Sequence, residues 1–118
     1  MEYKVTLTPK ARRDLTDIWD YIARDDLEAA TAFCHDLAQQ AYSLKTFPER
    51  NSELRKRRNI RKISYQNYLI FYKVHADQNW VEILRFWHSA RDQGRLRLRE
   101  ESSALYSPSP KAVPAVSV

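Results

Sequence analysis

The sequence has a single glycine, a single cysteine and no long apolar segment in its 118 residues. Loops that cradle nucleotide phosphates need several glycines, so Gly94 alone excludes a nucleotide-binding loop of that type. Cys34 has no partner for an internal disulfide, which fits a reducing compartment. No segment approaches the roughly 20 apolar residues that cross a bilayer. We therefore expect a soluble, cytoplasmic protein without membrane association.

Potential metal ligands are equally sparse. His35 and His75 lie far from any second ligand, and no group of Cys, His or carboxylate residues has the spacing of a metal site. We predict neither a metal nor a cofactor.

Basic residues exceed acidic residues by 20 to 15, which gives a formal net charge of +5. This charge favours an anionic partner, which can be a nucleic acid, a ribosome, a nucleoprotein enzyme or an acidic protein. The charge does not choose between these partners.

The length and the hydrophobic content of 43% indicate one compact domain with a single core. We assign residues 1–100 to this domain. The remaining residues, 101–118, hold three of the five prolines together with Ser, Ala and Val. This composition predicts a disordered C-terminal tail.

Periodicity predicts one strand and two helices in the first half of the chain. Tyr3, Val5 and Leu7 alternate with polar residues, as in a half-buried strand. Thr8 and Pro9 are typical of a helix start, and apolar residues then recur at steps of three and four. A second helix is expected to begin with the capping-box spacing of Asp25 and Glu28 and to end near Phe47 and Pro48. Together the two helices form a hairpin with a shared apolar face.

The second half predicts a sheet. The segments Ile60 to Tyr65, Tyr68 to His75 and Trp80 to His88 are rich in β-branched and aromatic residues and are separated by short polar stretches. A basic, aperiodic stretch from Glu49 to Asn59 is expected to be an exposed loop. The predicted fold class is α+β: an N-terminal strand and a two-helix hairpin packed on a largely antiparallel sheet, which a three-stranded C-terminal meander completes.

Two strings on this framework resemble the RelE/ParE toxin family over nearly all of residues 2–92. The first is TPKARRDLTDIWDYIA, from Thr8 to Ala23, which is similar to the family's opening helix. The second is NIRKISYQNYLIFYKV with VEILRFWHSARD, which is similar to the family's Arg, Tyr-x-x-x-Tyr-x-Val and His-x-x-Arg-Asp pattern. The resemblance implies a RelE/ParE-like fold and a small cytoplasmic toxin that a cognate antitoxin neutralises.

The family has two branches with different activities. RelE-like members cut messenger RNA on the ribosome, whereas ParE-like members inhibit DNA gyrase and are not nucleases. RNA cleavage without a metal needs a base, an acid and cations around one phosphate. The residues available for it are Arg61, Arg85, His88 and Arg91.

Two features favour the ParE-like branch, in which no residue is catalytic. RelE-like nucleases tend to carry a functional Tyr or His after the last strand, but no tyrosine occurs between His88 and Tyr106. Strand parity also places Arg85 and His88 on opposite faces unless a bulge intervenes. The alternatives are a RelE-like, ribosome-dependent mRNA endonuclease and an inactive member that only pairs with an antitoxin.

Each candidate residue also has a structural interpretation. His88 is expected to bond a backbone carbonyl at the end of a strand. Arg85 is expected to pair with Asp14 or Asp17, because a buried unpaired charge is costly. The partner-binding candidates are the basic residues of the loop and of the segment after the last strand, and they would contact gyrase, or alternatively the ribosome and mRNA, or the antitoxin: Arg55, Lys56, Arg57, Arg58, Arg91, Arg95 and Arg97.

Overall fold

The computed structural model describes residues 2–54 and 59–91. Its strands and helices follow in the order β1 (Lys4–Leu7), α1 (Pro9–Ala23), α2 (Leu27–Tyr42), β2 (Ile60–Tyr65), β3 (Tyr68–His75) and β4 (Trp80–His88). Short 3-10 helices lie at Ser43–Lys45, Pro48–Arg50 and Ala76–Gln78. The predicted basic loop residues 55–58, the tail, Arg95 and Arg97 lie outside the described residues.

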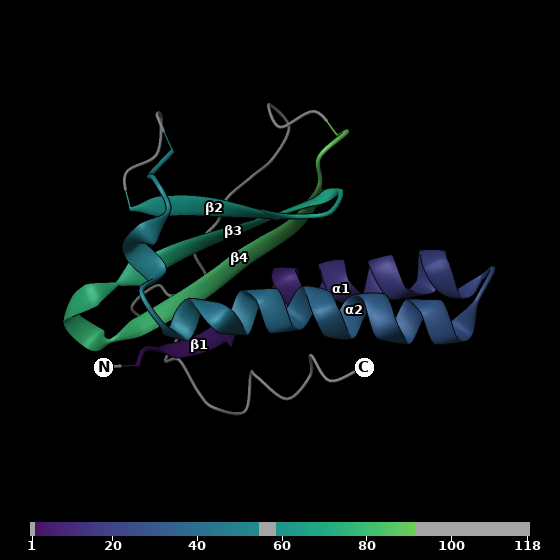
Figure 1. Cartoon of the computed structure of the whole chain (residues 1–118), viewed down its shortest axis with the longest axis horizontal. Helices are drawn as coiled ribbons and strands as arrows, with labels where there is room; N and C mark the ends of the chain where they lie inside the picture. Colours follow the sequence, from purple (N-terminus) through teal and green to yellow (C-terminus); the bar gives the residue numbers. More distant parts are fainter. Residues whose placement is uncertain (1, 55–58, 92–118) are drawn as a thin grey trace.

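The strands form one sheet in the order β1-β4-β3-β2 (Figure 1). β2, β3 and β4 pair antiparallel as the predicted meander, while β1 pairs parallel with β4. The two helices lie side by side and pack against one face of the sheet (Figure 1). The predicted α+β fold is confirmed. Within the described residues, no helix is long and apolar enough to cross a membrane.

The boundaries of the second helix differ from those predicted. Its N-cap is Asp26, whose carboxylate accepts a hydrogen bond from the Ala29 amide at 3.0 Å, so the cap lies one residue after Asp25. Its α-helical hydrogen bonding ends at Tyr42 instead of Phe47. The Ser43 hydroxyl there donates to the Gln40 carbonyl at 2.6 Å, and a 3-10 turn carries the chain onward.

Apolar residues cover both faces of the sheet. The main core lies between the sheet and the helices and includes Leu15 of α1, Leu37 of α2 and Ile83 of β4. A second cluster occupies the opposite face; its buried members are Ile60, Leu69, Phe71, Leu84 and Trp87. The sheet therefore has no wholly polar face in the described part of the chain.

A bulge in β4 changes which side chains share a face. Ile83 lies opposite Tyr72 and Arg85 lies opposite Phe71, which leaves Leu84 as the extra residue. As a result Phe86 joins Ile83 in the main core, while Leu84 and Trp87 belong to the second cluster. Arg85 lies opposite Phe71 of the second cluster and His88 lies opposite Tyr68 of the main core, so the two do occupy opposite faces as predicted. The predicted grouping of Arg85 with Ile83 and of His88 with Leu84 was wrong, because it assumed an unbroken alternation.

Thr8 joins the end of β1 to both α1 and β4. Its hydroxyl accepts from the Ala11 amide at 3.0 Å and donates to the Leu84 carbonyl at 3.1 Å. Its own amide donates to the Ile83 carbonyl at 3.0 Å. Thr8 is the N-cap that the sequence predicts, and it also satisfies the backbone of β4 at the bulge.

We expect Thr8→Ala to lower the free energy of unfolding by about 1–2 kcal/mol, because it removes an N-cap and leaves a buried carbonyl without its donor. Urea denaturation measures the loss. Thr16→Ala is the matched control, since the Thr16 hydroxyl is exposed and bonds only the Arg12 carbonyl. Equal losses for the two variants would contradict this account of Thr8.

Candidate functional site

Asp14 on α1 lies at the open edge of the last strand. β1 pairs with β4 only from Trp80 to Ile83, so the residues beyond Ile83 have no neighbouring strand on that side. The Asp14 carboxylate accepts hydrogen bonds from Arg85 Nε at 2.7 Å, from Arg85 Nη2 at 3.0 Å and from the Phe86 amide at 3.0 Å. Both side chains of the ion pair are 12% exposed. The prediction that Arg85 pairs with a helix carboxylate is confirmed, with Asp14 as the partner.

His88 ends the same strand. Its Nδ1 accepts a hydrogen bond from the Ala90 amide at 3.0 Å. The expected bond to a backbone carbonyl was wrong, because the chain turns after His88 and directs an amide at the ring. An Nδ1 that accepts leaves the proton of a neutral imidazole on Nε2. The ring also meets Tyr68 edge-on, with 5.0 Å between the centroids and an interplanar angle of 80°.

Arg91 follows this turn and stacks on a tryptophan. Its guanidinium carbon lies 4.0 Å from the centroid of the Trp87 ring, and the guanidinium carbon of Arg85 lies 5.1 Å from the same centroid. The Trp87 Nε1 donates to the Arg91 carbonyl at 3.4 Å. Arg91 is nevertheless exposed. Stacking on Trp87 therefore holds its cationic group at the surface.

A hollow of about 360 Å³ opens where α1 faces the end of β4. Its lining includes Asp14, Asp17 and Tyr21 of α1, Tyr68 of β3, and His88 and Arg91 at the end of β4. Burial raises the pKa of the Tyr68 hydroxyl, so this group is a neutral hydrogen-bond donor at physiological pH. We call this group of residues the β4-end site. It can bind a partner by charge and by aromatic contact.

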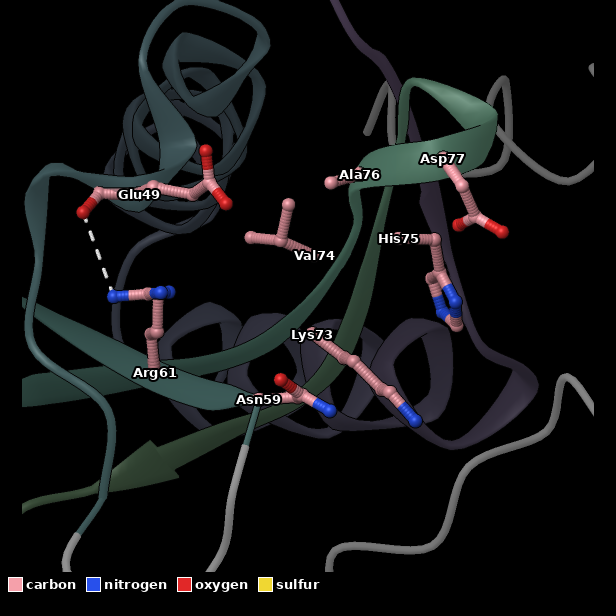
Figure 2. Close-up of a pocket in the computed structure, with 8 residues that line it drawn as sticks. All are labelled: Glu49, Asn59, Arg61, Lys73, Val74, His75, Ala76 and Asp77. Carbon is pink, nitrogen blue, oxygen red and sulfur yellow. Dashed lines mark hydrogen bonds between the residues drawn. The ribbon is translucent and has the colours of Figure 1, made fainter.

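Arg61 lies at a different end of the sheet. Its Nη1 donates to the carbonyls of Asn51 and Glu49, and its Nη2 is 3.9 Å from the Glu53 carboxylate. It lines a separate hollow of about 460 Å³ with Asn59, Lys73, Val74, His75, Ala76 and Asp77, and Figure 2 shows its guanidinium directed at the Glu49 backbone. Arg61 lies opposite Tyr72, which lies opposite Ile83. His88 lies opposite Tyr68, four residues along β3 from Tyr72, which corresponds to about 13 Å along the strands.

The four residues of the nuclease alternative therefore do not form one site. His88 and Arg91 line one hollow at the end of β4, but Asp14 binds Arg85, which lies on the opposite face from His88, and Arg61 is remote. The sequence interpretation missed Tyr21 and Tyr68 as neighbours of His88. Tyr68 and Tyr72 are four residues apart, so their rings lie on the same face of β3, toward the main core. This spacing was the feature of the sequence that could have placed Tyr68 on that face. Among the described residues, no three metal-ligating side chains gather.

We expect Asp14→Ala to lower the free energy of unfolding by about 3 kcal/mol, because it leaves the largely buried Arg85 charge and the Phe86 amide without their acceptor. Asp17→Ala is the control, since Asp17 is an exposed carboxylate on the same helix. Denaturant unfolding compares both variants.

Arg85→Leu in the Asp14→Ala background should recover part of the loss by removing the unpaired charge. A double variant less stable than Asp14→Ala would contradict the assigned pair.

Residues 5–93 match the model of the ParE toxin family, the toxin of the parDE type II toxin-antitoxin system. The chromosomal ParDE system from P. aeruginosa has a similar structure, with a TM-score of 0.64 and 20% identity over 74% of this chain and 96% of that chain. The RelBE2 toxin-antitoxin complex from Mycobacterium tuberculosis is similar with a TM-score of 0.55 and 27% identity over 75% of this chain and 99% of that chain.

No curated protein sequence matches the chain significantly. The P. aeruginosa structure supports the fold, and the family model covers most of the sequence. The chain therefore belongs to the ParE toxin family of type II toxin-antitoxin systems.

Proposed function

We propose that this toxin acts by binding and inhibiting DNA gyrase and that it does not cleave RNA. The proposal rests on one observation: the four candidate nuclease residues have different partners and do not lie around one point. Asp14 binds Arg85 through two donors, and Arg61 lies about 13 Å along the strands from His88. An acid, a base and the cations of a nuclease must surround a single phosphate. The described arrangement lacks that convergence.

The proposed gyrase-binding surface is basic and lies at the end of β4. Arg91 is its described member, held outward by Trp87. Arg95 and Arg97 follow it in the sequence. Arg55 to Arg58 form a separate basic run that precedes β2, whose first residue, Ile60, lies opposite Lys73 at the other end of the sheet. A surface of this charge favours a nucleoprotein partner, because it attracts phosphates as well as acidic side chains. Gyrase bound to DNA is such a partner.

We further propose a cognate antitoxin in the same cytoplasm. The two similar structures are described as a ParDE system and a RelBE2 toxin-antitoxin complex, and this chain belongs to the same toxin family. An open hollow along α2 is lined by Leu27, Thr31, Ala32 and His35 together with two acidic residues. Leu27 is 61% exposed. An amphipathic helix of the antitoxin fits such a surface.

The test is inhibition of DNA supercoiling by gyrase with the purified toxin. We expect inhibition by the native chain and about tenfold weaker inhibition by Arg91→Ala, which corresponds to about 1.4 kcal/mol of binding free energy. Lys45→Ala is the matched control, because Lys45 is also an exposed cation but lies in the 3-10 helix after α2, whose end bonds the Tyr3 amide at the other end of the sheet. Unchanged supercoiling at toxin concentrations above those of gyrase would refute the proposed target.

The same preparation distinguishes the RelE-like alternative, which the 27% identity to the RelBE2 complex motivates. Cleavage of a translated message at codon positions in a ribosome assay would establish an endonuclease. A chain that is harmless when overexpressed without an antitoxin, and inactive in both assays, would indicate a member that only pairs with an antitoxin.

A further inference from the structure

Phe47 is an exposed aromatic residue in a left-handed backbone conformation. It lies between the 3-10 helices Ser43–Lys45 and Pro48–Arg50, with φ 50° and ψ 56°, and it is 77% exposed. Bulky residues rarely adopt positive φ, and such strain persists only where the surroundings determine it. Exposure of a phenyl ring to water provides no stabilisation that would offset this strain. The conformation therefore points to a contact that the ring makes.

The surrounding loop fixes this conformation. The Arg50 guanidinium donates through Nη1 to the Thr46 carbonyl at 2.6 Å and to the Phe47 carbonyl at 3.2 Å. The hydroxyl of the fully buried Tyr72 donates to the Pro48 carbonyl at 2.6 Å and accepts from Asn51 Nδ2 at 3.0 Å. The ring is thus presented from a rigid frame that is anchored in the core.

A hollow of about 270 Å³ lies beside the ring, lined by Tyr3, Thr46, Phe47, Pro48 and Glu49. The Tyr3 amide donates to the Lys45 carbonyl at 2.8 Å, which fixes the start of the chain beside the loop. Two aromatic rings and a proline therefore flank one exposed carboxylate. Hollows with aromatic walls bind proline-rich segments, whose extended backbone loses little entropy on binding.

We propose that the occupant of this hollow is the chain's own C-terminal segment, residues 102–118. It contains Pro108, Pro110 and Pro114, which suit the aromatic walls, and Lys111, which suits Glu49. The residues that connect this segment to the end of β4 are also long enough to reach the hollow. Residues 92–101 span at most about 33 Å when extended. Tyr3 precedes Lys4, which lies opposite Trp80, and Trp80 lies opposite His75. The path along β3 from His75 to Tyr68, which lies opposite His88, is about 23 Å.

The proposed docking position of the tail is on the toxin itself, at the end of the sheet opposite the β4-end site, and it is independent of gyrase as the target. A partner that uses Phe47 must then displace the tail, whose effective concentration is high because it is tethered.

A spin label on the tail of the full chain tests the contact. Ser117→Cys supplies the label position, and burial raises the pKa of the Cys34 thiol to about 11, so that buried group stays unlabelled at neutral pH. We expect the amide signals of Tyr3, Thr46 and Glu49 to lose most of their intensity in the nuclear magnetic resonance spectrum. Amides at the far end of α1 should be unchanged.

Phe47→Gly in the labelled chain should restore those signals. Glycine accepts the positive φ without strain, so this variant keeps the loop and removes only the ring. Tyr21→Ala removes an aromatic residue that is 69% exposed elsewhere, and it should leave the broadening intact. The proposal is overturned if the three amides are not broadened, if Phe47→Gly does not restore them, or if labelled chain broadens an unlabelled copy, which would assign the hollow to a second molecule.

Discussion

The three hydrogen bonds to the Asp14 carboxylate are the contact on which the last strand depends. β1 is only four residues long, and beyond Ile83 it gives way to α1. Without a neighbouring strand, the Phe86 amide would be a buried donor with no acceptor, and such groups destabilise a fold. Asp14 supplies that acceptor and neutralises Arg85 in the same contact. One carboxylate therefore ties the helical hairpin to the centre of the sheet.

The bulge at Leu84 determines which face of the sheet each later residue of β4 occupies. It brings Phe86 into the main core, while Leu84 and Trp87 pack on the other face. The same shift directs His88 toward Tyr68 and leaves Trp87 as the platform for Arg91. A strand with regular alternation would have placed Phe86 on the face of Leu84, away from the main core. The geometry of the β4-end site is thus a consequence of one extra residue.

Local pattern sufficed for the elements but not for the site. The strands, the N-cap at Thr8 and the helical stripes follow from neighbouring residues, so their periods predicted them. The pairing of Arg85 was narrowed to Asp14 or Asp17 because a buried cation needs a carboxylate and both lie on the first helix. The bulge depends on how β3 and β4 align in space, and no period in the sequence marks it. The partner of His88 was wrong for a similar reason, since it is set by a turn after the strand.

The hydrogen-bond partners of the arginines explain why a motif that a family shares does not determine the activity of each member. A guanidinium has a limited set of donors in a rigid plane. When two of them bind a buried carboxylate, as in Arg85, the cation is neutralised before any substrate arrives. Arg61 directs its donors at carbonyls of its own chain in the same way. Arg91 differs, because a ring face holds it without using its N–H groups. Of the candidate cations in the described residues, it is therefore the one best prepared to bind another molecule.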